Sequence, residues 1–264
     1  AIAVPWGMNF WCPQTNVMGN GWQYQYSADK IRGFKQTHQP SPWMNDYGQF
    51  SIMPVTGKLK FNEQQRASWF SHKAEIVKPY YYKVYLADHD VTTEVTATER
   101  AAQFRFTFPG TDSAFIVVDA FDKGSYVKII PSQHKIIGYT TRNSGSVPSN
   151  FKNWFVIIVD KDFSLNYTWH DSVLNKQDLE MKANHSGAVI GFKTLKGEQV
   201  HLKVASSCIS IEQAELNLTR ESGKDSFDAT CKKAKTSWNK YLGRLIPEGG
   251  TVDEVRTFYS CLYR

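Results

Sequence analysis

The sequence has 264 residues, of which 41% are hydrophobic, 14% aromatic and 21% charged, and a formal net charge of +6 at pH 7. This length suits one large domain or two modest ones, and the composition is that of an ordinary globular protein. No apolar run approaches the roughly 20 residues that span a bilayer, so we expect no membrane span. The basic residues are scattered, without a basic arm or a recognition helix, so we expect no nucleic-acid partner.

From about residue 49 to residue 211 the dominant period of the sequence is two, which is typical of half-buried strands. The apolar positions that alternate are Phe104, Phe106 and Phe108; Tyr82, Val84 and Leu86; Val91, Thr93 and Val95; and Val200, Leu202 and Val204. Residues 115–118 and 154–159 are continuously apolar and predict central strands that are covered on both faces. Turn-forming residues separate these runs. The pattern predicts a mainly β fold, a large antiparallel β-sandwich.

The period changes to that of a helix near residue 225. A predicted helix begins with Asp225 as its N-cap and ends near Gly243, and its apolar positions are Phe227, Cys231, Ala234, Trp238, Tyr241 and Leu245. Thr251 and Glu254 then form a capping box ahead of a second apolar stripe, which is Val252, Val255, Phe258, Tyr259 and Leu262. Because a short isolated helix is marginal in water, we expect the sequence to be cut at the start of a second, helical domain. The start, which lacks Met and a visible signal peptide, is also expected to be processed or cut.

The segment from Gly33 to Gly48 is the strongest candidate for a binding site. Pro40 and Pro42 fix φ and disfavour a helix, so we predict a stiff loop. Flat rings suit the C–H faces of a sugar, and amide, carboxylate and imidazole groups suit its hydroxyls. We predict that Trp22 and Trp43 are stacking platforms and that the hydroxyl partners are His38, Gln39, Asn45 and Asp46. The structural alternative is that both tryptophans anchor the core and that Asp46 caps a turn.

A second aromatic segment lies near the N-terminus and includes Trp6, Asn9 and Trp11. These residues either line the same cleft as the Gly33–Gly48 loop or belong to an N-terminal strand that packs its aromatic side chains into the sandwich. The sequence leaves both interpretations open.

The sequence contains no convincing catalytic pair and no metal site. A glycosidase needs two carboxyl groups that face each other across the glycosidic bond it cleaves. Four aspartates are instead predicted at strand ends, where turn-forming Asp is common: Asp119, Asp122, Asp160 and Asp162. Glu94 and Glu99 are predicted to be solvated. Six histidines are isolated in the sequence and are predicted to be structural or exposed: His72, His89, His134, His170, His185 and His201. Common catalytic and nucleotide-binding motifs are missing.

The four cysteines are far apart in the sequence and form no C-x-x-C pair, which argues against a zinc site. They are Cys12, Cys208, Cys231 and Cys261. Buried thiols and one long-range disulfide both remain open.

A series of motifs from one end of the sequence to the other resembles the N-terminal region of family-92 glycoside hydrolases. The motifs are residues 5–8 (PWGM), 33–48, 53–57 (MPVTG), 79–84 (PYYYKV), 94–100 (EVTATER), 104–109 (FRFTFP), 238–242 (WNKYL) and 258–264 (FYSCLYR). The resemblance implies a calcium-dependent, inverting, exo-acting α-mannosidase with an N-terminal β-sandwich, a helical linker and a C-terminal (α/α)6 barrel. On this basis we expect the sandwich at 1–222, a linker helix at 223–247 and the start of the barrel at 248–264, the rest of the barrel being absent.

The resemblance also implies where the chemistry lies. The general acid, the general base and the calcium ligands would come mainly from the barrel, so we expect no catalytic and no metal-binding residue in this sequence. The sandwich would contribute substrate-binding residues to a cleft that it shares with the barrel: Trp22, His38, Gln39, Trp43, Asn45, Asp46 and Tyr47. Residues 39–44 (QPSPWM) depart from the glycine- and cysteine-containing loop of many family members, and this loop would shape the leaving-group side.

The expected substrates are α-mannoside glycans, for example mannose-rich N-glycans, and the expected location is secreted or periplasmic. The expected intramolecular partner is the C-terminal (α/α)6 domain. Two alternatives from other classes remain: a stand-alone carbohydrate-binding module, and a sandwich that only supports the barrel.

Overall fold

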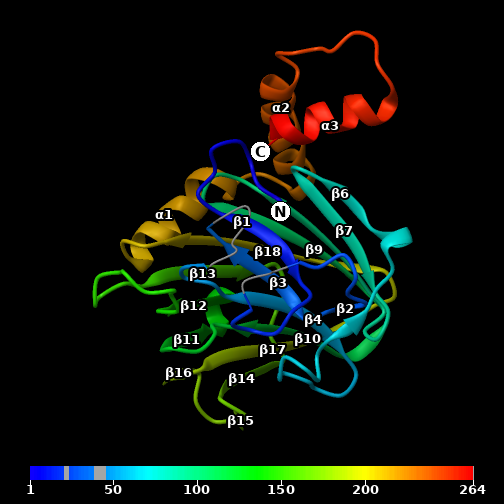
Figure 1. Ribbon diagram of the computed structural model, residues 1–264. Helices are drawn as coiled ribbons and strands as arrows, with labels where there is room; N and C mark the ends of the chain where they lie inside the picture. The colour runs from blue at the N-terminus through cyan, green and yellow to red at the C-terminus, as the bar shows by residue number, and fades with distance from the viewer. Residues whose placement is uncertain (21–23, 39–45, 264) are drawn as a thin grey trace.

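The computed structural model describes residues 1–20, 24–38 and 46–263, and in these ranges two large antiparallel sheets are followed by three helices (Figure 1). The seven-stranded sheet has the order β1 (Phe10–Gln14), β3 (Gly33–Thr37), β4 (Ser51–Thr56), β10 (Thr111–Asp119), β17 (Ser186–Thr194), β14 (Leu165–His170) and β15 (Val173–Asn175). The nine-stranded sheet has the order β16 (Glu180–Ala183), β11 (Ser125–Ile130), β12 (Lys135–Thr140), β13 (Asn153–Val159), β18 (Glu198–Ser207), β9 (Ala101–Phe108), β8 (Val91–Ala97), β7 (Tyr81–Leu86) and β6 (Ile76–Lys78). A small sheet pairs β2 (Lys30–Ile31) with β5 (Ser68–Trp69), and 3-10 turns occupy His72–Ala74 and Pro131–Gln133.

The predicted antiparallel β-sandwich is confirmed. The alternating phenylalanines of residues 104–108 lie in β9, with all three rings buried. The continuously apolar run 115–118 lies in β10 between β4 and β17, and the run 154–159 lies in β13 between β12 and β18. Both runs therefore form interior strands, as their patterns predicted.

Trp11 belongs to the core between the two sheets. Its ring lies edge-on to Phe50 at 5.6 Å and to Phe104 at 5.0 Å. Its indole N–H donates to Asn9 Oδ1 at 2.7 Å, and the Asn9 amide donates to the carbonyls of Thr98 and Glu99, each at 3.0 Å. For Trp11 and Asn9, the structure therefore supports the interpretation that the N-terminal aromatic segment packs into the sandwich.

The two predicted helices are confirmed, with one correction. The first, α2, spans Phe227–Leu242 and has Gly243 as its C-cap, but its N-cap is Ser226, whose Oγ accepts the Ala229 N–H at 3.2 Å. The predicted cap Asp225 instead pairs its carboxylate with Lys233 at 2.6 Å. The second, α3, spans Val252–Tyr263 and begins with the predicted capping box, in which the Thr251 N–H donates to Glu254 Oε2 at 2.7 Å.

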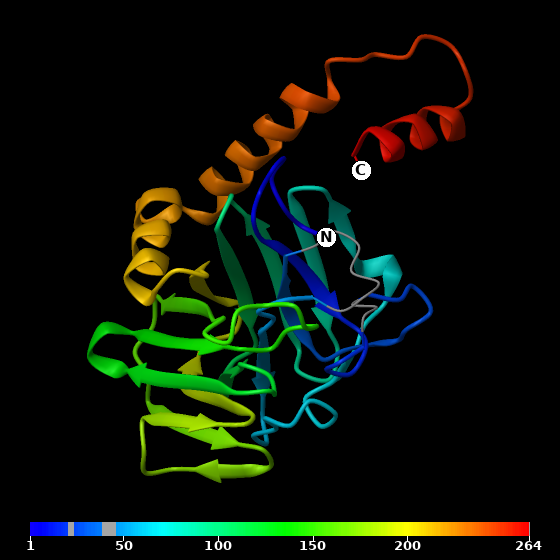
Figure 2. The same cartoon turned by 60° about the vertical axis from the view of Figure 1, so that its left-hand side comes forward.

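A third helix, α1 (Ile211–Ser222), was not predicted. It packs chiefly on β18 and β13, on the outer face of the nine-stranded sheet, where Ala214 and Leu218 cover Val156 and Ala205. Figure 2 shows α1 along this face, with α2 extending from it away from the sandwich. Helix α1 is short and mostly polar outside this narrow stripe, so its helical period is weak in the sequence.

Glu94 is buried, at 6% exposure, so the prediction that it is solvated was wrong. Its carboxylate accepts two hydrogen bonds from Arg105, both at 2.8 Å, and one from the Tyr81 hydroxyl at 2.6 Å. The Arg105 guanidinium also lies 4.5 Å from the centre of the Phe227 ring at the start of α2. Because α2 covers this part of the sheet, the outer face of β8 and β9 is not exposed to solvent here. Glu99, in contrast, is exposed as predicted.

Several histidines that are isolated in the sequence are paired in the fold. His72 contacts Glu75 at 2.5 Å, His134 contacts Asp162 at 2.7 Å and His201 contacts Asp160 at 2.8 Å. The four cysteines, all within the described residues, form no disulfide. Among the described residues, no helix is long and apolar enough to cross a membrane.

A buried charged cluster lies on the seven-stranded sheet, on the face that points away from the core. Arg66 donates to Asp119 Oδ2 at 2.8 Å, and His185 Nε2 donates to Asp119 Oδ1 at 2.7 Å. Burial alone would raise the pKa of Asp119, but these two cationic partners outweigh it and lower the pKa to about 2. Burial alone would lower the pKa of His185, but its hydrogen bond to Asp119 outweighs burial and raises the pKa.

We expect the His185→Gln variant to change the pH dependence of stability. A histidine whose pKa is raised by folding contributes its full stabilisation below the ordinary value of 6.5 and loses it as the pH rises through the folded-state value. The difference in free energy of unfolding between wild type and variant should therefore be largest below pH 6.5 and shrink at higher pH. Urea unfolding between pH 5 and pH 9 measures it; a difference that stays constant over this range would contradict the charged His185–Asp119 pair.

Candidate functional site

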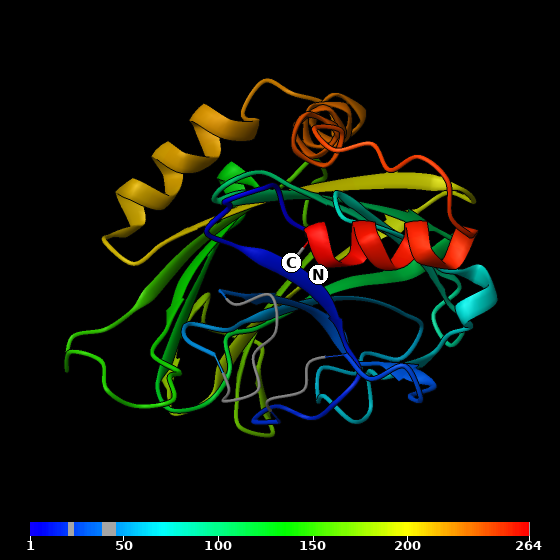
Figure 3. The same ribbon diagram turned by 45° about the horizontal axis from the view of Figure 1, so that its top comes forward.

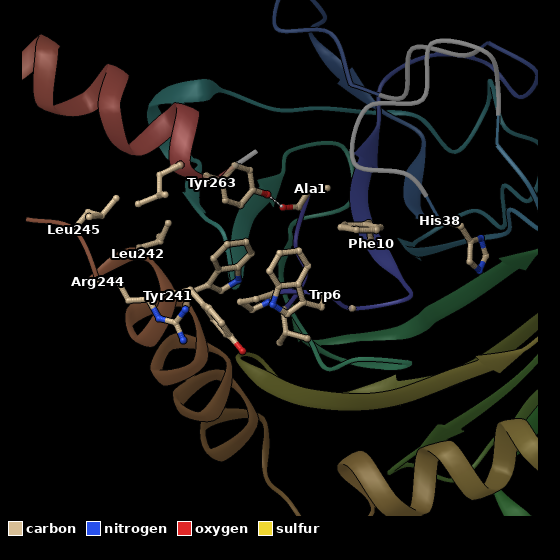
Figure 4. A pocket seen from close by; sticks show the side chains of 14 residues that line it. Ala1, Trp6, Phe10, His38, Tyr241, Leu242, Arg244, Leu245 and Tyr263 are labelled. Carbon is tan, nitrogen blue, oxygen red and sulfur yellow. Dashed lines mark hydrogen bonds between the residues drawn. The ribbon is translucent and has the colours of Figure 1, made fainter.

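A groove of about 1100 Å³ lies between the N-terminal segment, the end of α2 and helix α3 (Figure 4). Figure 3 shows the N-terminus close to the C-terminal end of α3. Its walls are mainly aromatic and aliphatic: Trp6, Phe10, Trp238, Tyr241, Leu262 and Tyr263. His38 lies at one end, in the loop that the sequence singled out. None of the described residues that line the groove is an aspartate or a glutamate.

Hydrogen bonds tie the N-terminal segment to both helices of the groove. The Trp238 indole N–H donates to the Ala3 carbonyl at 2.7 Å, and this bond is buried. The Tyr263 hydroxyl donates to the Ala1 carbonyl at 2.9 Å, and the rings of Trp238 and Tyr263 lie 4.9 Å apart (Figure 4). The walls of the groove therefore come from both ends of the sequence and are joined directly.

Trp6 is an unusual residue of this groove. Its φ of +62° lies in the left-handed region, which is costly for a bulky side chain, and its side chain is 85% exposed. The ring lies edge-on to Tyr241 at 6.1 Å, and the Arg244 guanidinium lies 5.0 Å from the Tyr241 ring. Trp6 and Trp11 therefore lie in different places: Trp11 belongs to the core, and Trp6 lines the groove.

The structure brings three of the predicted binding residues together: His38, Asp46 and Tyr47. The Asp46 carboxylate is 1% exposed and accepts the backbone N–H of His38 through Oδ2 and that of Tyr47 through Oδ1, the latter at 2.7 Å. Asp46 therefore joins the two described ends of the loop, which agrees with the alternative that it caps a turn. Four other predicted residues lie outside the described residues: Trp22, Gln39, Trp43 and Asn45. The binding role of the whole set stays a prediction.

His38 is suited to hydrogen bonding as a neutral imidazole. Burial lowers its pKa below the ordinary value of 6.5, and the Asp46 carboxylate and the Tyr47 backbone oppose this shift without reversing it. Its Nδ1 atom is buried and makes no hydrogen bond to the described residues. A neutral imidazole offers one donor and one acceptor, which matches the hydrogen-bonding capacity of a hydroxyl group.

The predicted Gly33–Gly48 loop was wrong for its first residues, because Gly33–Thr37 are buried and form strand β3 between β1 and β4, and the two prolines lie only beyond this segment. Buried amides next to the remaining loop fix its position, and the sequence did not predict them. Gln36, in β3, donates to Ser206 Oγ at 2.8 Å, and Asn153, in β13, donates to Gln36 Oε1 at 2.9 Å and to the Gly48 carbonyl at 2.7 Å. The loop is therefore bonded to both sheets. The available signal was the position of Gln36, a polar side chain on the core-facing side of a buried strand.

Gly48 meets both a conformational and a steric requirement at the end of the loop. Its φ is +64°, and a Cβ atom there would lie 2.4 Å from Asn153 Cβ. Its N–H donates to the Arg142 carbonyl at 2.7 Å. Only glycine fits this conformation and this close approach.

The described residues do not supply a metal site. No group of three or more His, Cys, Asp or Glu side chains in these ranges is placed to hold a metal ion. The buried carboxylates of Asp119 and Glu94 are occupied by arginine partners. A calcium site built from the described side chains therefore does not fit this structure.

Comparison with known proteins relates the two parts of the chain to one family. The family model described as "Glycosyl hydrolase family 92 N-terminal domain" matches residues 1–207. The model described as "Glycosyl hydrolase family 92 catalytic domain" matches residues 213–264.

Solved structures and a curated relative agree with these matches. A family GH92 inverting mannosidase from Bacteroides thetaiotaomicron is 43% identical, with a TM-score of 0.95 over 99% of this chain and 35% of its own. A second GH92 α-mannosidase from that organism, also solved with mannoimidazole, is 28% identical, with a TM-score of 0.88 over 99% of this chain and 37% of its own. An uncharacterized secreted glycosidase of Arthroderma benhamiae is 22% identical over 99% of this chain and 38% of its own. The chain thus spans little more than a third of each relative.

Proposed function

Because the chain belongs to glycoside hydrolase family 92, we propose that it is the N-terminal part of an inverting α-mannosidase that hydrolyses terminal α-mannosides. The observation that carries this proposal is the likeness to an inverting mannosidase at 43% identity and a TM-score of 0.95 over 99% of the chain. The substrates would be α-mannoside glycans, for example mannose-rich N-glycans.

The chain's own role in this proposal is to position the substrate. An inverting displacement uses one carboxyl group to protonate the glycosidic oxygen and another to activate water. The described lining of the groove has no carboxyl group, so both would come from the remainder of the protein, in the (α/α)6 domain. His38, held by Asp46, would bind a sugar hydroxyl, while Trp22 and Trp43 would stack on the sugar rings. Gln39, Asn45 and Tyr47 would complete this wall of the cleft.

Calcium is part of the proposal only for the remainder of the protein. The described residues offer no suitable site, and no step assigned to this chain passes through a metal ion. In the whole enzyme, calcium held by the (α/α)6 domain would polarise sugar hydroxyls as a hard, oxygen-binding cation.

The proposed location is secreted, because the relative from Arthroderma benhamiae is described as a secreted glycosidase. A bacterial periplasmic location remains a proposal from the family resemblance. A stand-alone carbohydrate-binding module is less well supported, because residues 213–264 match the catalytic-domain model of the family.

We expect the purified 264-residue chain to release no mannose from α-mannosides, while the whole enzyme does. The physical reason is that the described groove contains no carboxyl group, and the displacement uses two. The measurement is mannose release from α-linked mannobiose with the chain at high concentration. Circular dichroism verifies that the chain is folded. Robust release by the folded chain would overturn the division of roles, and lack of release by the whole enzyme would overturn the proposed activity.

A further inference from the structure

Three aromatic side chains form a row across neighbouring strands on the outer face of the nine-stranded sheet. Tyr126 (β11) is directly opposite Tyr139 (β12), and Tyr139 is directly opposite Trp154 (β13). The rings of Tyr126 and Tyr139 stack with centres 5.5 Å apart, and Trp154 lies edge-on to Tyr139 at 4.8 Å. Neighbouring strands are about 4.8 Å apart, so this aromatic row is about 10 Å long, the scale of a short oligosaccharide.

The row is open to solvent at its two ends. The central ring, Tyr139, is 8% exposed, whereas Tyr126 and Trp154 are half-buried. On the same face, helix α1 covers Val156 and Ala205, next to Trp154 along β13 and β18. The sheet thus buries its aliphatic positions under a helix and leaves the outer two rings of the aromatic row partly accessible.

Charged side chains border the row. The Lys152 ammonium lies 4.5 Å from the centre of the Tyr139 ring and 5.1 Å from that of Trp154. At the other end, Glu180 of the neighbouring strand β16 pairs with Lys128 at 3.1 Å. Aromatic surface with donors and acceptors at its edge is the combination that a neutral, hydroxyl-rich ligand requires.

One end of the row lies near the loop that is proposed to bind substrate. Tyr47 lies edge-on to Phe151 at 6.4 Å, and Phe151 directly precedes Lys152. The Gly48 carbonyl accepts the Asn153 amide at 2.7 Å, and Asn153 directly precedes Trp154. Successive side chains of a strand point to opposite faces of the sheet, so Asn153 points into the sandwich and Trp154 points outward. The Asp46–Gly48 end of the loop therefore lies near the start of β13, beside the Trp154 end of the row.

We infer that the aromatic row is a distal sugar-binding site that holds pyranose units of an extended glycan while its terminal mannoside is in the cleft. The C–H bonds of a pyranose carry partial positive charge and pack favourably on the negative face of an aromatic ring. Trp154 and Tyr126 provide the contact surface, Tyr139 supports them, and Lys152 donates to hydroxyls. This inference rests on the proposed function, since it assigns the ligand class from the substrate of the same protein.

The test compares an extended mannan oligosaccharide with α-linked mannobiose in the whole enzyme carrying Trp154→Ala or Tyr126→Ala. We expect each variant to raise KM for the oligosaccharide about two- to tenfold, the scale of one aromatic contact, with kcat and mannobiose kinetics unchanged. Trp69→Ala is the matched control, because Trp69 is also a partly exposed tryptophan, 47% exposed, in the small β2–β5 sheet. Urea unfolding of each variant separates binding from stability.

If KM changes equally for both substrates, or changes for neither, the inference of a distal sugar-binding site is wrong. If the wild-type enzyme releases no mannose, the proposed activity is wrong, and sugar binding by the aromatic row is then tested by direct binding. Equilibrium dialysis of the oligosaccharide against the same proteins would then show weaker binding by Trp154→Ala and Tyr126→Ala than by Trp69→Ala if the row binds sugar. Equal binding by the three variants and the wild type would overturn it.

Discussion

Replacing Arg66 by methionine is expected to lower the free energy of unfolding by about 3–5 kcal/mol, the range for removing one partner of a buried ion pair. Arg66 is fully buried, and its guanidinium also donates to the carbonyls of Arg32 and Phe61, both at 2.8 Å. Methionine fills much of the volume but leaves the Asp119 carboxylate with His185 as its remaining cationic partner, in surroundings that exclude water. Urea unfolding at pH 7 measures the loss.

The matched control for Arg66 is an ion pair of the same kind at the surface. Lys193 and Asp112 lie 3.2 Å apart with side chains that are 75% and 80% exposed, so Asp112→Asn should leave the unfolding midpoint unchanged. A loss below about 1 kcal/mol for Arg66→Met would show that the buried cluster does not stabilise the sandwich.

Replacing Asp46 by alanine is expected to lower kcat/KM of the whole enzyme for α-mannosides about 100-fold, because misplacing a substrate-positioning group by about 1 Å costs on this scale. The variant removes the acceptor for the His38 and Tyr47 N–H groups, which are buried or half-buried, and thereby releases both described ends of the loop. Steady-state kinetics on mannobiose measures the effect, and urea unfolding reports how far the sandwich itself is weakened.

Asp162→Ala is the corresponding control, since this side chain is 94% exposed and lies outside the groove. Asp46→Asn should fall between wild type and alanine, because an amide keeps one oxygen acceptor and loses the charge. Wild-type kinetics in a stably folded Asp46→Ala variant would mean that the sandwich only supports the barrel and that the loop takes no part in positioning the substrate.

The strands of the sandwich follow closely from the sequence. The apolar residues alternate in β7, β8, β9 and β18 and are continuous in β10 and β13, and each pattern can be recognised within a single strand. The capping box at Thr251 and the C-cap at Gly243 are local in the same sense. Helix α1 escaped prediction because its stability comes from packing on the nine-stranded sheet, with only Ala214 and Leu218 buried in its apolar stripe.

The candidate site can be predicted from the sequence only in part. The sequence identified the loop as a cluster of sugar-compatible groups, and the structure joins His38, Asp46 and Tyr47 at its ends. The sequence also raised Trp6 for a cleft, but only the fold shows that it shares a groove with Tyr241 and Tyr263, from helices more than 200 residues later. No spacing rule connects such residues, because the contact exists only after the chain has folded.

The sequence by itself determined the β-sandwich, two of the three helices in the described part of the chain, the family resemblance and the loop on which binding is proposed, because each of these depends on neighbouring residues or on motifs. Only the tertiary structure decided which polar groups are buried and what they pair with. Glu94 reads as a solvated strand residue until α2 covers it, and Asp119 reads as a turn residue until Arg66 and His185 surround it. The physical reason is that a charge is stable inside a protein only with its partners, and those partners come from distant parts of the chain.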